Sequence, residues 1–160
     1  MHLRSQWESG RLPDLIGLVA RLILAGALIW AGAVKVTNPA QSALAVRAFK
    51  LLDYDVAGYV GYGLPVLEIL LGLLLAVGLF TRVSAAVGGL LMLAFIFGIG
   101  WAWAHGYSID CGCFGGGGTI AASQTQYPQE ILRDAGFLAC AVWLVVRPRT
   151  LYSLDHRLSG

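Results

Sequence analysis

Two cysteines separated by one glycine are the most conspicuous reactive groups in this sequence. Cys111 and Cys113 lie in the segment Asp110-Cys111-Gly112-Cys113-Phe114-Gly115. A disulfide requires Cα atoms about 4.4–6.8 Å apart, and an extended tripeptide lies at the upper edge of that range. Gly112 makes the necessary turn feasible. Because the resulting small ring would be strained, and strained exposed disulfides are used in exchange, the spacing predicts a redox pair at the tip of a loop.

Two other interpretations of the same cysteines stay open. The pair could simply clip the loop or tie it to another chain. Alternatively, His105, Cys111 and Cys113 offer ligand types that zinc or copper accept, although two thiolates with one intervening residue are not a common zinc knuckle. The neighbouring Asp110 disfavours a thiolate. The helix expected near Pro128, with Arg133, would favour one if the loop folds back.

A third cysteine, Cys140, leaves an odd thiol after one internal disulfide. It is expected near the middle of the last apolar segment. Free cysteine packs there as a small apolar residue, so packing is its expected role. A thiol at that depth could also meet a membrane-borne electron carrier.

Three charged residues lie in or beside apolar segments, where charges are costly and often functional. From the rise per residue, Glu68 is expected ~8 Å in height from Arg21 and ~13 Å from Lys35. The heights therefore favour Arg21 as its partner. An ion pair and a proton or quinone role both remain open. Pro65 also frees a backbone carbonyl one turn earlier in the same helix.

Composition indicates that a membrane surrounds the elements that position these residues. The chain has 160 residues, of which 58% are hydrophobic and only 12% are charged, which is too little polar surface for a water-soluble globule. The formal net charge of +2 and the scattered basic residues exclude a nucleic-acid partner. We therefore expect one integral membrane domain whose principal partner is the lipid bilayer.

Four apolar segments are long enough to cross a hydrocarbon core of about 30 Å. They are residues 15–34, 59–80, 83–104 and 128–146, and the last has Glu130, Arg133 and Asp134 in its first turns. Residues 39–52 place their leucines on one face, which predicts a short interfacial helix. The expected fold is an all-α four-helix membrane bundle over residues 15–146, with polar tails at 1–14 and 147–160. Rows of small residues are expected to line helix contacts, namely Ala94, Gly98 and Ala102, and Gly136 with Cys140.

The distribution of Lys and Arg predicts the orientation of this bundle. One side collects Arg4, Arg11, Arg82, Arg147, Arg149 and Arg157, and the other collects Lys35, Arg47, Lys50 and Arg133. Because cytoplasmic loops carry the excess of positive charge, both termini are expected in the cytoplasm. The loop with Cys111 and Cys113 would then be extracytoplasmic.

The chain resembles the MauE and DoxX-like family of small four-span bacterial membrane proteins. The resemblance is carried by Ala31-Gly32-Ala33-Val34-Lys35 followed by Asn38-Pro39, by Leu64-Pro65-Val66-Leu67-Glu68 with Gly72 and Gly78 following, and by Cys111-Gly112-Cys113-Phe114-Gly115. It implies the bacterial plasma membrane and a role in electron or disulfide traffic. MauE-like proteins are associated with disulfide formation during maturation of an exported enzyme, and DoxX-type relatives with quinone-linked sulfur oxidation or oxidative-stress complexes. The resemblance also implies Cys111 and Cys113 as the redox pair, with Lys35 and Glu68 as family-pattern positions that have no assigned role.

Two functions of different classes follow as expectations. The first is a thiol-disulfide oxidoreductase in which Cys111 and Cys113 exchange electrons with a thioredoxin-fold or exported protein, linked to a membrane quinone. The second is an accessory or assembly subunit of a larger respiratory or oxidative-stress complex, in which the pair only shapes the loop. No segment of the sequence identifies a quinone site.

Overall fold

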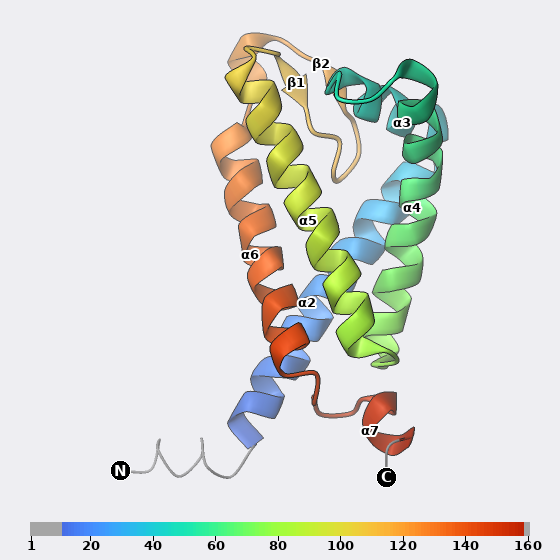
Figure 1. Cartoon of the computed structure of the whole chain (residues 1–160), viewed down its shortest axis with the longest axis vertical. Helices are drawn as coiled ribbons and strands as arrows, with labels where there is room; N and C mark the ends of the chain where they lie inside the picture. The colour runs from blue at the N-terminus through green and yellow to red at the C-terminus, as the bar shows by residue number, and fades with distance from the viewer. Residues whose placement is uncertain (1–10, 159–160) are drawn as a thin grey trace.

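Long helices run side by side between the two ends of the molecule in the computed structural model, which describes residues 11–158 apart from the side chain of His156 (Figure 1). The long helices are α2 (Arg11–Val36), α4 (Tyr54–Val77), α5 (Thr81–Ala104) and α6 (Tyr127–Val146). The shorter elements are α3 (Pro39–Ala48), β1 (Ile109–Asp110), β2 (Gly118–Thr119), η1 (Ala122–Gln124) and α7 (Leu154–Leu158). One end of the bundle carries α3 and the two strands, and the other end carries the start of α2 and α7 (Figure 1).

Within the described residues, three helices are long and apolar enough to cross a membrane: α2, α4 and α5. The helix α6 is not among them. It has 20 residues, and Glu130, Arg133 and Asp134 lie in its first turns. A crossing by α6 is therefore not confirmed, although α6 packs along α5 and α2 as a member of the bundle.

A close helix crossing joins α2 and α4 through two glycines. A Cβ atom added at Gly32 would lie 2.6 Å from Cγ1 of Ile69, and one added at Gly72 would lie 2.6 Å from Cγ1 of Ile29. Hydrogen alone fits at these positions, so the two backbones approach closely. The predicted rows of small residues are wrong in part, because Ala94 is exposed and Gly136 has no neighbour within 4 Å.

Helix α3 docks on α4 at the point where Pro65 interrupts the helical hydrogen bonds. Pro65 has no N–H to donate to the carbonyl of Gly61, and the hydroxyl of Ser42 donates to that carbonyl instead, at 2.6 Å. The freed carbonyl thus becomes an anchor for α3.

The helix α3 is shorter and more buried than the predicted interfacial helix over residues 39–52. It ends at Ala48, and it buries Ser42, Ala43 and Ala45. Leu44 remains exposed on the same helix, as do Leu51 and Leu52 beyond its end. The apolar leucines therefore face away from the protein, while the small residues make the contact with α4.

The segment between α5 and α6 folds back over the end of the bundle. The strands β1 and β2 pair antiparallel, with Ile109 opposite Thr119 and Asp110 opposite Gly118. The hydroxyl of Tyr127 accepts a hydrogen bond from the N–H of Ile109 at 3.0 Å and donates to the carbonyl of Tyr107. This anchoring holds the cysteine segment against the helices.

Residues after α6 also belong to the fold, where a polar tail was predicted from residue 147. Thr150 and Ser153 are buried. The Asp155 carboxylate accepts hydrogen bonds from the N–H groups of Phe80 and Thr81, both at 2.8 Å, and so caps the start of α5. The prediction of a separate tail missed this attachment.

Candidate functional site

The two cysteines of the predicted pair lie in contact. The sulfur atoms of Cys111 and Cys113 are 2.6 Å apart, and the N–H of Cys113 donates to Sγ of Cys111 at 3.3 Å. Gly112 makes the turn with φ at +68°, a conformation that glycine adopts without strain. A disulfide can therefore form between these sulfurs without a rearrangement of the chain.

The pair is buried, whereas the sequence predicted an exposed loop tip. Cys111 is 8% exposed and Cys113 is 4% exposed. Both belong to a core cluster with Ile99, Ala102 and Tyr127, because the loop folds back onto the ends of α5 and α6. Loop composition alone, rich in Gly, Ser and Thr, gave no sign of this burial.

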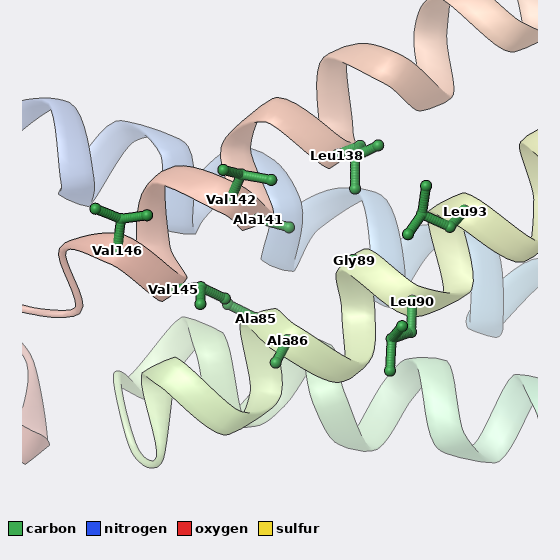
Figure 2. Close-up of a pocket in the computed structure, with 10 residues that line it drawn as sticks. All are labelled: Ala85, Ala86, Gly89, Leu90, Leu93, Leu138, Ala141, Val142, Val145 and Val146. Carbon is green, nitrogen blue, oxygen red and sulfur yellow. The ribbon is translucent and has the colours of Figure 1, made fainter.

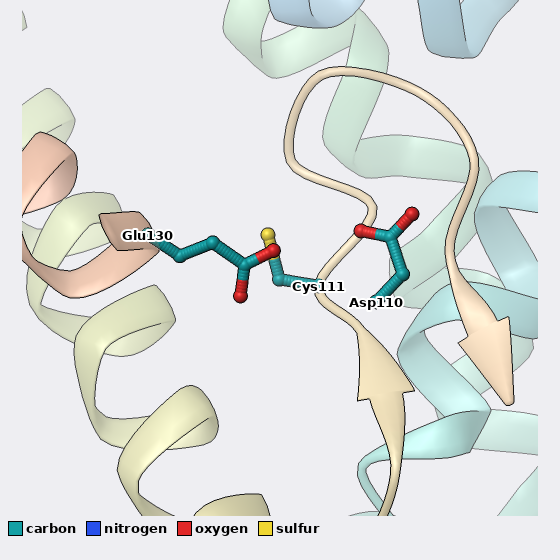
Figure 3. A group of neighbouring side chains, drawn as sticks. All are labelled: Asp110, Cys111 and Glu130. Carbon is teal, nitrogen blue, oxygen red and sulfur yellow. The ribbon is translucent and has the colours of Figure 1, made fainter. Parts of the chain in front are cut away.

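Helix α6 supplies the charged side chains beside Cys111. Nη2 of Arg133 lies 3.8 Å from Sγ of Cys111, so a cation faces this sulfur. The carboxylate of Glu130 approaches it as well, and Figure 3 shows Glu130 reaching from α6 toward the sulfur while Asp110 flanks it on the loop. The polar atoms of Asp110, Cys111 and Glu130 all lie within 4.8 Å of one another.

Asp110 shapes the loop through both of its carboxylate oxygens. Oδ1 accepts from the N–H of Gly112 at 3.2 Å, and Oδ2 accepts from the N–H of Gly117 at 3.3 Å. Gln41 of α3 donates to the carbonyl of Gly117 at 2.6 Å. The cysteine turn is therefore tied to its own loop and to α3.

Cys113 faces the interior of the bundle. The hydrogen bond with Cys111, burial, and the negative charges of Cys111 and Asp134 raise the pKa of the Cys113 thiol well above its ordinary value, against the opposing charge of Lys35. Cys113 and Asp134 line a narrow cavity together with Glu68, with room for about one water molecule. At neutral pH the Cys113 sulfur is thus held as a thiol beside two buried carboxylates.

Each of these carboxylates has a cationic partner. Asp134, 1% exposed, pairs with Arg133 at 3.1 Å. Nζ of Lys35 lies 2.7 and 3.0 Å from the two oxygens of Glu68, and both residues are buried. The prediction that Arg21 is the easier partner of Glu68 is wrong.

Arg21 lies toward the other end of the bundle, where it joins α2 to the C-terminal segment. Its Nη1 donates to Oγ1 of Thr150 at 2.8 Å, and its Nη2 donates to the carbonyl of Tyr152 at 3.4 Å. The prediction compared only heights along straight helices. It could not show that Lys35 points toward Glu68, or that Arg21 points toward residues that follow α6.

Two further predicted residues are not brought to the cysteine pair. Cys140 packs beside a different core cluster, which is built on α2, α4, α5 and α6. His105 is exposed, stacks on the Trp101 ring at 4.0 Å between centroids, and places Nδ1 2.9 Å from the Trp101 carbonyl. The His105 ring therefore contacts Trp101 of α5 and not the cysteine pair.

The arrangement does not favour a metal ion. In the described part of the chain, the one group of three potential ligands is Asp110, Cys111 and Glu130, without the predicted His105. Asp110 is already engaged by two backbone N–H groups, and the cation of Arg133 lies beside the sulfur. A positive charge in that place opposes metal binding and favours a thiolate.

A second concave feature offers no chemical group. Figure 2 shows a groove between α5 and α6 that is lined by alanines, glycine, valines and leucines. Such a surface suits contact with lipid.

Glu130, Asp134 and Gln41 were not predicted to belong to the cysteine site. An available signal was the spacing of Glu130, Arg133 and Asp134, since positions three and four apart share one helix face. That spacing indicates one charged face at the start of α6. It does not indicate that the cysteine loop covers this face, which only the tertiary structure shows.

The chain matches one family of known proteins. No curated protein and no solved structure matched the chain. The family described as methylamine utilisation protein MauE matches over residues 13–147, which include α3 to α6, nearly all of α2 and the cysteine loop. The MauE part of the predicted resemblance is confirmed, and this match does not test the DoxX part. With three apolar helices long enough to cross a bilayer, this chain is a membrane protein that belongs to the MauE family.

Proposed function

We propose that the protein is a membrane thiol-disulfide exchange protein whose working groups are Cys111 and Cys113. The observation that carries the proposal is the 2.6 Å contact between their sulfurs beside the cation of Arg133. Proximity of the sulfurs permits a reversible disulfide, and a cation near one sulfur supports the thiolate that attacks another disulfide. The partner would be a thioredoxin-fold or exported protein.

The distribution of Lys and Arg supports an extracytoplasmic cysteine loop. Lys35 and Arg133, both counted on the loop side, are committed to Glu68 and Asp134. Arg47 and Lys50 remain there, and each lies over a tyrosine ring. The opposite side has six Lys and Arg residues against these four, so the positive-inside rule favours it as the cytoplasmic side of a bacterial plasma membrane.

A membrane quinone does not fit at the cysteine pair as it stands. The cavity beside Cys113 is lined by Phe95, Phe114 and Phe137 and has room for about one water molecule, which is far less than a quinone ring needs. We therefore derive no step through a quinone, and we assign the exchange to a protein partner.

Thiol trapping in native membranes tests the proposal. Membranes with the wild type, Cys111→Ser, Cys113→Ser and Cys140→Ser are treated with a mass-tagged maleimide before and after reduction. We expect the wild type and Cys140→Ser to gain two tags on reduction. We expect either Cys111→Ser or Cys113→Ser to abolish the internal disulfide, and Cys113→Ser to accumulate a mixed disulfide between Cys111 and a partner.

The other interpretations have their own signatures in the same experiment. A pair that stays oxidised under every condition, in a protein that copurifies in fixed ratio with a complex, would replace exchange by an accessory or assembly role. Zinc or copper that copurifies with the wild type and is lost in Cys111→Ser would support a metal-binding loop.

A further inference from the structure

Glu130 lies where it can accept the proton of the Cys111 thiol and donate it again. It lies in the first turn of α6, and its carboxylate comes close enough to interact with both the thiol and the backbone N–H of Cys111 (Figure 3). Its Oε2 atom is buried and has no hydrogen-bond partner among residues 11–158. The carboxylate thus keeps an open position beside the sulfur.

The other acidic groups near the pair are either engaged or face Cys113. Both oxygens of Asp110 accept backbone N–H groups of the loop. Asp134 pairs with Arg133 through Oδ1. Its Oδ2 is buried without a hydrogen-bond partner among the described residues, as Oε2 of Glu130 is, but Asp134 borders the cavity on the side of Cys113 and not Cys111. Glu130 is therefore the carboxylate with free capacity at Cys111.

The surroundings of the two sulfurs differ, and they favour Cys111 as the thiolate that attacks the partner disulfide first. Arg133 faces Cys111 at 3.8 Å, and the N–H of Cys113 donates to the same sulfur, so both contacts stabilise a Cys111 thiolate. Cys113 is held as a thiol. The charged and titratable groups around the pair are Asp110 on the loop, Glu130, Arg133 and Asp134 on α6, Lys35 on α2 and Glu68 on α4.

We propose that Glu130 is the proton acceptor and donor for Cys111 during disulfide exchange, which makes it a further catalytic residue of this site. The proposal rests on the exchange function proposed above. It assigns Arg133 to stabilising the thiolate and Cys113 to resolving the mixed disulfide.

The exchange balances without any further oxidant. Glu130 takes the Cys111 proton, and the thiolate attacks one sulfur of a partner disulfide, so that a Cys111–partner bond forms and the partner S–S bond breaks. The departing partner sulfur receives the proton from Glu130. Cys113 then attacks Cys111, and its proton passes to the second partner sulfur, so that the Cys111–Cys113 disulfide forms and the second partner sulfur leaves as a thiol. Two electrons and two protons pass to the partner, and the reverse sequence oxidises a partner dithiol.

The test separates proton transfer from thiolate formation. In a Cys113→Ser/Cys140→Ser background, Cys111 reacts either with 2-hydroxyethyl disulfide, an uncharged probe whose leaving sulfur needs a proton, or with iodoacetamide, whose leaving iodide needs none. Glu130→Gln should slow mixed-disulfide formation at pH 7 by roughly tenfold or more. It should leave alkylation as fast or faster, because the slow alkylation step depends on the equilibrium fraction of thiolate, whichever group takes the proton, and removing a negative charge favours the thiolate. Glu130→Asp should restore part of the exchange rate.

Asp55→Asn is the matched control, since Asp55 also lies in the first turn of a helix at this end of the bundle, and it should change neither rate. Equal exchange rates for Glu130→Gln and its parent would overturn the role of Glu130 alone, as would a parallel fall in both reactions. A parent protein whose Cys111 forms no mixed disulfide, although iodoacetamide alkylates it, would instead overturn the exchange function.

Discussion

Lys35 and Glu68 form the most deeply buried ion pair near the cysteines, at 6% and 0% exposure. Removing one partner of such a pair leaves an uncompensated charge in an apolar surrounding, whereas removing both takes away the desolvation cost as well. The same logic applies to Arg133, whose cation serves Asp134 and Cys111 together. At this scale, the charged residues of the site depend on one another.

Lys35→Met should lower the free energy of unfolding by about 3–5 kcal/mol, because Glu68 loses its partner. The double substitution Lys35→Met/Glu68→Leu should recover most of this loss. Lys50→Met, at an exposed position on the same end, should change stability by less than about 1 kcal/mol. Thermal unfolding in detergent measures all three, and a double variant no more stable than the single one would contradict this account.

Arg133→Gln should slow the alkylation of Cys111 at neutral pH by roughly tenfold, since an opposite charge beside a titrating group favours its charged form. The rate is measured with iodoacetamide in a Cys113→Ser/Cys140→Ser background. Arg47→Gln removes a guanidinium at the same end that contacts Tyr54 and Gly58, and it should leave the rate unchanged. An unchanged alkylation rate in Arg133→Gln would contradict the proposal that Arg133 stabilises the Cys111 thiolate.

At the scale of helices, glycine and proline decide how close the elements come. Gly32 and Gly72 allow α2 and α4 to touch backbone to backbone, and Pro65 frees the Gly61 carbonyl that Ser42 then uses to anchor α3. The helix α3 in turn supports the cysteine loop through Gln41. The position of the sulfurs thus depends on contacts made by α2, α4 and α3.

Gly72→Ala should destabilise the bundle by about 1–3 kcal/mol, because the added methyl group would lie 2.6 Å from Ile29 and force the helices apart. Gly63→Ala is the control on the same helix, where a Cβ meets nothing within 4 Å. It should leave the melting temperature in detergent nearly unchanged. Equal melting temperatures for the two variants would show that the crossing tolerates a wider separation.

At the scale of the whole molecule, the end opposite the cysteines is closed by the segment that follows α6. Burial alone would raise the pKa of Asp155, but hydrogen bonds from the N–H groups of Thr81 and Phe80 and the charge of Arg21 outweigh burial and hold the pKa below its ordinary value. Asp155 therefore stabilises the fold when it is ionised.

Asp155→Asn should weaken the attachment of α7 to α5 by about 0.5–2 kcal/mol, as the loss of a helix-capping carboxylate does. Because the folded pKa is lowered, this stabilisation is present above the unfolded value near 3.9 and disappears as the pH falls through the folded pKa. Limited proteolysis should cut residues 147–158 faster in the variant at pH 7. Equal cleavage of the two proteins at pH 7 would contradict the proposed contact.

The proposed orientation makes a separate prediction about accessibility. In a Cys111→Ser/Cys113→Ser/Cys140→Ser background, Ser123→Cys lies exposed on η1 at the loop end, and Arg157→Cys lies exposed on α7 at the other end. A membrane-impermeant maleimide applied to whole cells should label the first cysteine, and it should label the second only after lysis. The opposite pattern would place the cysteine loop in the cytoplasm.

The sequence by itself determined the long apolar helices, because twenty consecutive apolar residues and their flanking polar residues depend only on local composition. It also predicted the turn at Gly112, since two cysteines with one intervening residue can form a disulfide only if the chain turns between them, and glycine permits that turn. Helix ends were predicted to within a few residues, apart from the start of α4, five residues earlier than the predicted second span. These features are local in the chain, so no knowledge of distant neighbours was needed.

Tertiary structure decided what the reactive residues meet. Lys35 rather than Arg21 pairs with Glu68, the loop buries its cysteines, and Glu130 stands beside Cys111. Each of these outcomes depends on helix rotation and on the path of a glycine-rich loop, which are fixed by packing between segments far apart in sequence. Spacing along the chain gives the height of a residue along its helix axis. It does not give the direction in which the side chain points around that axis, and this direction decides which partner a buried charge meets.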